Sequence, residues 1–348
     1  MKPRVASILP STVRMSDVAR EAGVARVTVS RVLSDPESVA PTTRAAVQQA
    51  IARLGYVPNL NAGTLASSRS RIVGGIVPSL SNAWFAETID GLSEVLEEAD
   101  YQLLLAQSNY DMGRELRTAL TLLGRRVDAL MLTGTGHASA LRELVGRAGI
   151  PVVETWDLPA HGGHGVDAPL DMVAGFSNVQ AGEAAASHLL ARGCRHLGFI
   201  GADEERARKR LQGFADTVER AGRGPVNPWL GSPPTAFDAG AAALQQLRER
   251  EPRLDAVFCS NDTLAAGALF ECRRRGWGVP RDIAIVGFSD QPIAAASVPA
   301  LTSVAIQARE LGRRAATMLV ARLEGGSDAA LLPKVVDLGF RIVARESA

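Results

Sequence analysis

From Ile72 onward the chain alternates short apolar runs with segments whose apolar residues recur at helical spacing, and this alternation limits the fold more than any other feature. The apolar runs include IVGGIVP, DALMLTG, HLGFIGA and IAIVGFSD, and the helical segments include WFAETIDGLSEVLEEAD and ARELGRRAATMLVARLEGG. Strands that are apolar on both faces and separated by helices are typical of parallel sheets covered on both sides. There are too many runs for one ordinary sheet, so we expect two doubly wound parallel-sheet lobes.

The cleft between two such lobes is the expected ligand site, because ligands of open α/β sheets bind beyond the carboxyl ends of the strands. Polar residues that follow the apolar runs are therefore candidates for ligand contacts. The polar, proline- and glycine-rich segment DLPAHGGHGVDAPLD marks the region where the first lobe gives way to the second.

The head of the chain is basic although the whole chain is nearly neutral. The net charge of the 348 residues is +1. Residues 1–71 contain ten Lys and Arg and four acidic residues, whereas the rest of the chain contains 28 Lys and Arg and 33 acidic residues. A basic head on an acidic body indicates that only the head meets a polyanion such as nucleic acid.

Two short helices separated by a glycine are predicted within this head. Ser16 is expected to cap the first helix, Gly23 to end it, and ARVTVSRVL to form the second. A third helix, TTRAAVQQAIARLG, would close a small three-helix core. This is the helix-turn-helix pattern, in which the second helix enters the major groove of DNA. By pattern alone, a solvated helical hairpin docked on the body stays open as the alternative.

The face of the second helix that points away from the core carries the candidate DNA contacts. Arg26 and Arg31 have guanidinium groups that can pair bidentately with guanine. Val27 can meet a thymine methyl group, whereas Thr28 and Ser30 suit phosphate contacts or helix caps.

The segment VPNLNAGTLASSRSRIVGG that follows is polar and small, apart from one isolated leucine, Leu65. A linker that folds into a short helix on DNA and inserts Leu65 between base pairs of the minor groove would explain this leucine. The alternative is a flexible linker whose leucine packs loosely on a lobe.

Several stretches carry a resemblance to the LacI/GalR family of transcriptional regulators. SDVAREAGVARVTVSRVL and RLGYVPNLNAGTLASSRSRIVGGIVPSL resemble the head, hinge and first strand of that family. AGIPVVETWD, LDAVFCSNDTLAAGALFECRRRGWGVPRDIAIVGF and PKVVDLGF resemble its subgroup of gluconate-operon repressors. The similarity extends over nearly the whole chain.

The resemblance implies an all-α helix-turn-helix head and an α/β body folded like periplasmic binding proteins. The head would comprise residues 1–58, the hinge helix or linker 59–71 and the effector-binding and dimerisation domain 72–348. Within the body, the first lobe would comprise about 72–174 plus 302–325, and the second about 175–301 plus 326–348. A homodimer would read a pseudo-palindromic double-stranded operator. Since the chain ends in FRIVARESA without a leucine heptad, a dimer is expected rather than a tetramer.

The resemblance also assigns roles to single residues. Arg26 and Val27 would read bases, Arg31 would contact DNA near the operator centre, and Leu65 would intercalate. Ser16, Thr28, Ser30 and Asn59 complete the expected DNA-binding set. In the body, the expected effector contacts are Phe85, Thr133, Trp156, Arg210, Asn261 and Ser289.

Two of these positions depart from the family pattern, in which a carboxylate often follows VGF and the strand that begins IPVV. Ser289 and Trp156 stand there instead. A carboxylate would repel an anionic ligand by several kcal/mol at contact, whereas a serine or an indole would not. With Arg210 supplying charge-assisted hydrogen bonds, the pocket is expected to take a sugar acid such as gluconate or a keto-gluconate. A regulator of a neutral sugar is the alternative.

Each of these sites has a plainer interpretation. Phe85 fits an ordinary core position, Arg210 a solvated one in the run EERARKR, and Trp156 a rim aromatic. His137 fits a helix cap or an exposed residue better than a hydroxyl contact, and Asp262 could cap a helix beside Asn261.

No enzymatic, metal or cofactor site is expected. LTGTGHASA only superficially resembles a dinucleotide fingerprint, and the sequence has no serine elbow, phosphate loop or metal-ligand spacing. No apolar run is long enough to cross a membrane, and the first residues lack a secretory signal, so a cytoplasmic location without a membrane partner is expected. A sugar-binding protein without DNA function is the rival class, although it would have no use for a basic head. Release of DNA by the effector is the family default, and corepression would use the same residues.

Overall fold

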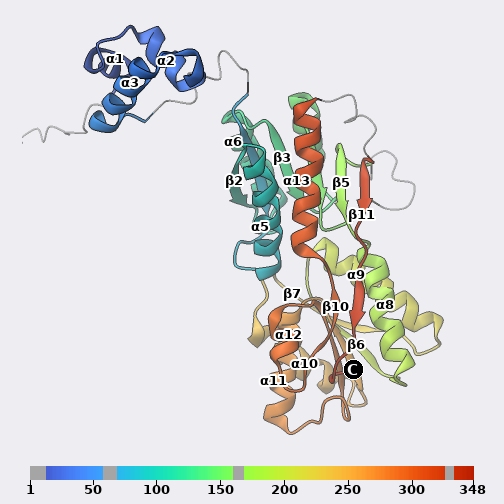
Figure 1. The fold of residues 1–348 in the computed structure, drawn as a ribbon. Helices are drawn as coiled ribbons and strands as arrows, with labels where there is room; N and C mark the ends of the chain where they lie inside the picture. Colours follow the sequence, from blue (N-terminus) through green and yellow to red (C-terminus); the bar gives the residue numbers. More distant parts are fainter. Residues whose placement is uncertain (1–12, 58–68, 160–167, 326–332) are drawn as a thin grey trace, which may run out of the picture. The chain divides into compact units, whose positions relative to one another are not determined.

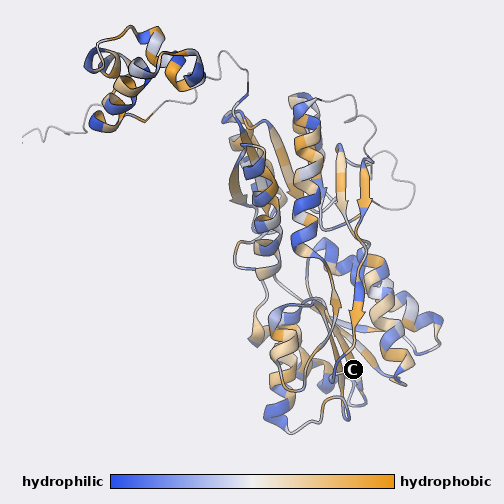
Figure 2. Ribbon diagram, in the orientation of Figure 1, coloured by the Kyte–Doolittle hydropathy of each residue, from blue (hydrophilic) through white to orange (hydrophobic). Residues whose placement is uncertain are grey.

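The computed structural model describes residues 13–57, 69–159, 168–325 and 333–348 (Figure 1). The chain folds as two compact units, Met1–Ser70 and Arg71–Ala348. None of the helices in these described ranges is long and apolar enough to cross a membrane. Figure 2 shows hydrophobic residues along the strands and on one side of each surface helix.

The first unit contains the three predicted helices, α1 (Met15–Glu21), α2 (Arg26–Ser34) and α3 (Pro41–Leu54), with a short 3₁₀ turn η1 (Pro36–Ser38). Gly23 and Gly55 have φ values of 66° and 61°, which favour glycine and end α1 and α3. Its core is formed by Val18, Ala19, Val29, Val32, Val47, Ala50 and Tyr56. Leu33 at the end of α2 lies outside this core and is 36% exposed.

One detail of this unit corrects the sequence analysis. Helix α1 begins at Met15, so the N-cap is Arg14 and not Ser16. The backbone N–H of Arg14 donates to the Asp17 carboxylate at 2.9 Å, and Ser16 lies exposed in the first turn. A side chain at the third helical position can accept a hydrogen bond from the backbone N–H of the N-cap residue. Asp17 is therefore the residue that stabilises the start of α1.

The first lobe of the second unit is a six-stranded parallel sheet with strand order β11-β5-β4-β3-β1-β2. Its strands are β1 (Ile72–Val77), β2 (Gln102–Gln107), β3 (Ala129–Thr133), β4 (Val152–Thr155), β5 (Met172–Gly175) and β11 (Val335–Asp337). Helices α5 (Ala83–Glu98) and α13 (Ala308–Glu324) share a core with one face of the sheet. Helices α6 (Met112–Gly124) and α7 (Ser139–Ala148) share a core with the other face.

The second lobe is a six-stranded sheet with strand order β12-β10-β9-β8-β6-β7, parallel except for β12. Its strands are β6 (Leu197–Ala202), β7 (Asn227–Gly231), β8 (Ala256–Cys259), β9 (Ala284–Ser289), β10 (Thr302–Ala305) and β12 (Arg341–Val343). Its helices are α8 (Asn178–Ala191), α9 (Glu205–Arg220), α10 (Phe237–Arg250), α11 (Asp262–Arg275) and α12 (Pro292–Ala296). The predicted fold class is therefore confirmed, with a helical head and two doubly wound lobes.

Two strands lie in a different lobe from the one we expected. β10 pairs with β9, which places residues 302–305 in the second lobe, and β11 pairs with β5, which places residues 335–337 in the first. The expected boundaries at 301/302 and 325/326 are wrong for these segments. A strand belongs to the sheet in which it finds its hydrogen-bonding partners, and an apolar run of three or four residues does not reveal that partner.

Candidate functional site

A pocket lies between the two lobes, at the carboxyl ends of the parallel strands. From the first lobe it is lined by Asn82, Trp84, Phe85, Tyr110 and Trp156. From the second lobe it is lined by Ala202, Glu204, Arg206, Arg210, Thr235, Ser260, Asn261, Phe288 and Ser289. This is the position that the rule for ligands of open α/β sheets predicts.

The structure brings together five of the six residues proposed from the sequence to contact an effector. They are Phe85, Trp156, Arg210, Asn261 and Ser289. The sixth, Thr133, lines an adjoining cleft, and its hydroxyl donates to the carbonyl of Ile76 at 3.1 Å. The solvated interpretation of Arg210 and the rim interpretation of Trp156 are wrong, because these residues are only 6% and 3% exposed.

Stacked aromatic rings form the apolar wall of the pocket. The Phe85 and Trp156 ring centroids lie 5.2 Å apart in an edge-to-face arrangement, and Phe176, behind the pocket lining, makes a second edge-to-face contact with Trp156 at 6.0 Å. The indole N–H of Trp156 donates to the hydroxyl of Thr88 at 3.2 Å. This wall is rigid and suits the C–H face of a sugar chain.

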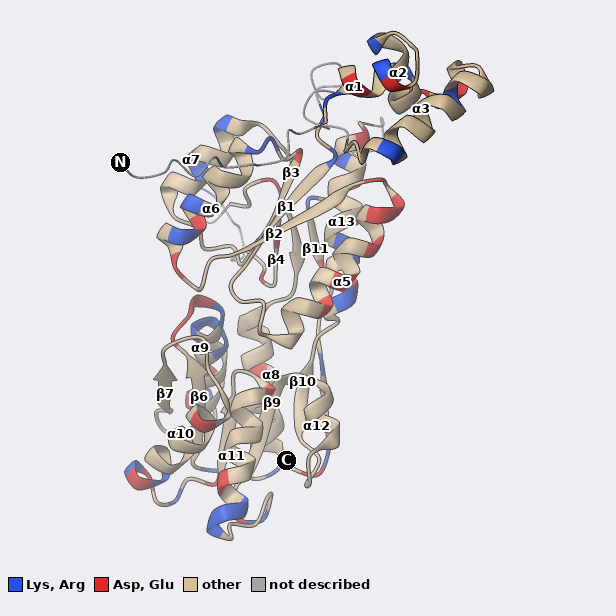
Figure 3. Cartoon of the chain, turned by 90° about the vertical axis from the view of Figure 1, so that its left-hand side faces the viewer, with Lys and Arg blue, Asp and Glu red and all other residues tan. Residues whose placement is uncertain are grey.

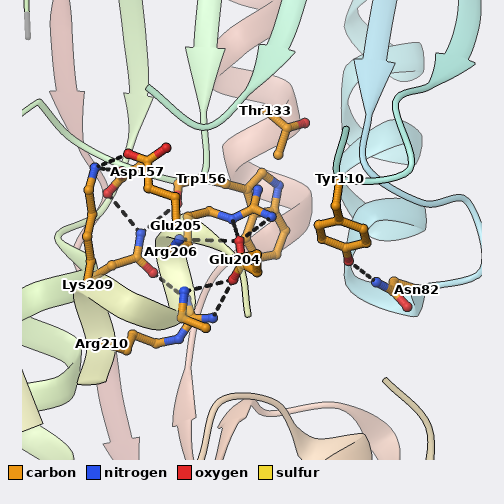
Figure 4. A network of polar contacts seen from close by, with 12 residues as sticks. Asn82, Tyr110, Thr133, Trp156, Asp157, Glu204, Glu205, Arg206, Lys209 and Arg210 are labelled. Carbon is orange, nitrogen blue, oxygen red and sulfur yellow. Dashed lines mark hydrogen bonds and ion pairs between the residues drawn. The ribbon is translucent and has the colours of Figure 1, made fainter. Parts of the chain in front are cut away.

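Three charged groups at the start of α9 form the polar wall, and sequence reasoning found only one of them. Glu204 is the N-cap residue of α9, and its carboxylate accepts from the backbone N–H of Ala207 at 2.7 Å. The same carboxylate accepts from the Arg206 side chain at 3.0 and 3.1 Å, and from Arg210 at 3.4 Å. Burial opposes the charge on Glu204, but Arg206 and Arg210 outweigh it and lower its pKa. Figure 4 shows this cluster.

Taken alone, Glu204, Arg206 and Arg210 carry one excess positive charge, and the more distant Asp157 also favours the charged form of both arginines. Burial opposes the charge of Arg206 as well, but Glu204 more than compensates and raises its pKa. Arg210 is less well compensated, and burial lowers its pKa to about 10, so it stays protonated at neutral pH. Two guanidinium groups thus face one carboxylate.

Arg210 and Ser289 have hydrogen-bonding capacity left over. One Arg210 nitrogen donates to the Asn178 amide oxygen, and the guanidinium lies 4.2 Å from the Phe288 ring centroid, whereas Nε has no hydrogen-bond partner among the described residues. The Ser289 hydroxyl is likewise buried and unpartnered within the described part of the chain. Nine buried side-chain atoms lack a hydrogen-bond partner among the described residues, and these two are the ones that belong to residues lining the pocket.

Trp156 and Ser289 both have backbone conformations that favour glycine, with φ values of 69° and 96°. Such conformations cost about 1–3 kcal/mol each and persist where the surrounding structure enforces them. The two residues follow or end β4 and β9, so the strained backbone lies at the pocket.

Asn82 and Tyr110 are further pocket residues that the sequence analysis missed. The Asn82 amide donates to the Tyr110 hydroxyl oxygen at 2.7 Å. Burial raises the pKa of Tyr110 to about 12, so its hydroxyl stays protonated and can donate a hydrogen bond into the pocket. Tyr110 lies three residues beyond the end of β2, within the loop that a strand-end rule applied to every strand would have included.

Asn261 caps α11, so the alternative that Asp262 does so is wrong. The Asn261 side chain accepts from the backbone N–H of Leu264 at 2.8 Å and donates to the Thr235 hydroxyl at 3.3 Å. Asp262 is buried one residue further on, where the Ser303 hydroxyl donates to it at 2.7 Å.

His137 is buried, so neither the cap nor the exposed interpretation is right. Its Nδ1 lies 3.0 Å from the Glu115 carboxylate, and its Nε2 lies 3.5 Å from that of Glu154. These contacts anchor the loop that follows β3.

In the first unit, α2 presents the predicted DNA contacts to solvent. Arg26, Val27, Ser30 and Arg31 are exposed, Val27 by 64%, and Thr28 is half-buried. Figure 3 shows basic segments on α2 and α3.

The basic side chains of this unit differ in whether they are paired. Arg20 is paired with Asp17 at 2.6 Å and Arg53 with Glu21 at 2.9 Å, whereas Arg26 and Arg31 have no ion-pair partner within the described residues. Both guanidinium groups of α2 are thus unpaired in the described part of the chain. The predicted contacts Asn59 and Leu65 lie outside the described residues.

Comparison with known families and proteins matches both units. Residues 14–59 match the family model described as "Bacterial regulatory proteins, lacI family", and residues 186–348 match that of a periplasmic binding protein-like domain. The transcriptional regulator GntR of Pseudomonas aeruginosa is 39% identical over 335 residues, which cover 96% of this chain and 95% of the relative. GntR of Escherichia coli K12 is 36% identical over 329 residues, which cover 94% and 96%.

A solved structure is similar to this chain over nearly its whole length. The crystal structure of a LacI-family transcriptional regulator from Silicibacter pomeroyi superimposes with a TM-score of 0.88 at 33% identity, and the match covers 96% of this chain and 99% of the other.

Proposed function

Because the chain belongs to the LacI family and is a DNA-binding transcriptional regulator rather than an enzyme, we propose that a small sugar acid bound between its lobes controls its affinity for an operator. The observation that carries this proposal is the excess positive charge in the pocket. Among the described residues, Glu204 is the only carboxylate that forms an ion pair with Arg206 and Arg210, and Nε of Arg210 has no hydrogen-bond partner there. A ligand carboxylate would neutralise this excess and accept the remaining N–H.

The rest of the pocket suits the hydroxylated chain of such an acid. Tyr110, Asn261 and Ser289 offer hydroxyl and amide groups on the sides of the pocket, and the aromatic wall covers the carbon chain. The alternative effector, a neutral sugar, would leave the excess charge uncompensated, which costs free energy in a buried site. A gluconate-type acid with one carboxylate and several hydroxyl groups matches both walls.

For the DNA side, we propose that α2 enters the major groove, with Arg26 and Val27 at base edges and Arg31 near the operator centre. Ser16, Thr28 and Ser30 would contact phosphates, and the hinge residues Asn59 and Leu65 would act in the minor groove. A homodimer with two heads would read a pseudo-palindromic operator. Repression relieved by the acid is the expected sign, and corepression is the alternative outcome.

An exposed aromatic pair supports the homodimer. The Phe237 and Phe270 rings, on α10 and α11, lie 6.1 Å apart and are both exposed. An apolar patch of this kind on the surface of one chain is typical of an interface, and a second copy of the chain would cover it.

The proposal is tested by a thermal-shift screen of sugar acids and matched neutral polyols on the full-length chain, repeated with Arg210→Ala. We expect D-gluconate or a related acid to raise the melting temperature of the wild type and to lose this effect in the variant. The same acid should change the affinity for an operator fragment. If neutral sugars stabilise the chain and acids do not, the acid effector is wrong.

A further inference from the structure

A buried carboxylate outside the pocket connects the two lobes. Asp157 follows Trp156 at the end of β4 in the first lobe, and its side chain is 2% exposed. It accepts from Thr135 of the same lobe at 3.0 Å, and from two residues of the second lobe, Asn178 at 2.9 Å and the Lys209 ammonium group. Asp157 is therefore held by side chains of both lobes (Figure 4).

The first two turns of α9 make further contacts with the loop after β3. The Lys209 ammonium group donates to the Thr135 hydroxyl at 3.3 Å and pairs with Glu205 at 2.9 Å. The Glu205 carboxylate lies so close to Gly136 that a Cβ atom at Gly136 would collide with it. The contact between the lobes is thus a continuous polar cluster rather than one ion pair.

Asn178 connects this cluster to the ligand pocket. Its amide nitrogen donates to the Trp156 carbonyl and to Asp157, both at 2.9 Å, and its amide oxygen accepts from Arg210. Both groups facing the nitrogen are acceptors, so the orientation of the amide is fixed. Arg210, which lines the pocket, and Asp157, which joins the lobes, are therefore held by the same side chain.

We propose that Asp157, Asn178 and Lys209 form an interlobe latch that stabilises the closed arrangement of the lobes around a ligand at Arg210. The proposal rests on the proposed function for its link to an acid effector. Asp157, Asn178 and Lys209 do not line the pocket, so they act as positioning residues. The latch determines how fast the lobes open, and the pocket determines which ligand they enclose.

The expected effect of breaking the latch is moderate, because Lys209 is 28% exposed and water screens its ion pair. Burial opposes the charge of Lys209, but Asp157 and Glu205 outweigh it and raise its pKa, so the ammonium group stays protonated at neutral pH. Loss of the ammonium group should therefore accelerate opening by about threefold to tenfold.

Lys209→Met and Arg208→Met provide a matched pair of variants. Arg208 is the adjacent residue on α9 and is paired with Asp203 of its own lobe at 2.5 Å, so its loss breaks an ion pair without touching the latch. Dissociation of D-gluconate from each full-length protein is followed by stopped-flow tryptophan fluorescence. We expect the dissociation rate to rise threefold to tenfold in Lys209→Met and to stay within twofold of the wild type in Arg208→Met.

Hydrogen exchange of the ligand-free proteins provides the second measurement. Faster exchange in segments 134–138 and 155–158 of Lys209→Met, but not of Arg208→Met, would support the latch. This holds even if no sugar acid binds the wild type, because the absence of binding would refute only the proposed function. Equal exchange and equal dissociation rates in the two variants would overturn the latch. If Lys209→Met does not fold, Thr135→Val removes the first-lobe hydroxyl of the cluster, and the same two outcomes apply.

Discussion

Replacing Arg210 by methionine should abolish most of the preference for an acid while leaving the fold almost as stable as before. Methionine has a similar length and no charge, so it fills the space beside Phe288. Burial lowers the pKa of Arg210 from 12.5 to about 10. At 1.36 kcal/mol per unit, keeping this guanidinium charged costs the folded state about 3 kcal/mol, an order-of-magnitude figure.

The variant removes this cost but loses contacts of similar value. The Asn178 amide oxygen would lose its donor, which costs about 1–3 kcal/mol for a buried group. The stacking on Phe288 is lost as well, whereas the attraction of Glu204 is already included in the pKa of about 10. Because gain and loss nearly cancel, the free energy of unfolding should change by less than about 2 kcal/mol.

Ligand binding should change much more. A charge-assisted hydrogen bond to a buried carboxylate is worth about 1.5–3 kcal/mol, so the affinity for D-gluconate should fall by about 10-fold to 150-fold. The affinity for D-sorbitol, which carries a CH₂OH group in place of the carboxylate, should change little. Calorimetric titration with both ligands measures this difference, urea unfolding measures stability, and Arg208→Met is the control for loss of an arginine.

Two results would refute this reasoning. A decrease of more than about 4 kcal/mol in the free energy of unfolding is exceptional for one substitution. It would mean that Arg210 has a mainly structural role and not a ligand-binding one. If Arg210→Met bound gluconate with undiminished affinity, the excess positive charge in the pocket would not be the group that binds the carboxylate.

Three other predictions concern the head, a buried carboxylate and a helix contact. Arg31→Ala should weaken operator binding. If Arg31 contacts a phosphate, the slope of log affinity against log salt concentration should also fall in magnitude by about one. Filter binding over a salt series measures both quantities, and an unchanged affinity would contradict the prediction. Burial raises the pKa of Glu154 to about 7, so the folded state binds this proton more tightly and loses stability as pH rises from about 5 to about 7. Between pH 5 and pH 8, the free energy of urea unfolding should fall less in Glu154→Gln than in the wild type, while His137 and Glu115 are unchanged in both proteins. Parallel curves of unfolding free energy against pH would exclude the effect. In Gly91→Ala, the added Cβ would collide with the Arg309 backbone carbonyl and push α5 away from α13, at a cost of about 1–3 kcal/mol in thermal unfolding; an unchanged melting temperature would contradict the close packing.

The fold and part of the site can be predicted from the sequence where they depend on the succession of strands and helices along the chain. The alternation of strands and helices is enough for two doubly wound lobes, and the strand-end rule together with the family resemblance names five residues that do line the pocket. Glu204 and Arg206 were missed because the run EERARKR gives no sign of which charges fold inward. Only the cap geometry of α9 turns the Glu204 carboxylate onto both arginines. The latch was missed for a related reason, since Thr135, Asp157 and Lys209 are far apart in sequence and meet only through the pairing of the lobes.

Glu204 also limits how much negative charge a ligand can bring. We argued from the sequence that the pocket favours an acid because Ser289 and Trp156 replace carboxylates, but Glu204 introduces one from another element. With two arginines and one glutamate, the excess charge is one, which a single carboxylate neutralises. A sugar phosphate carries about −1.5 to −2 at neutral pH and would leave a negative excess beside Glu204 in a buried site. If the proposed effector is right, the Glu204 carboxylate should therefore favour a monoanionic sugar acid over a phosphorylated sugar.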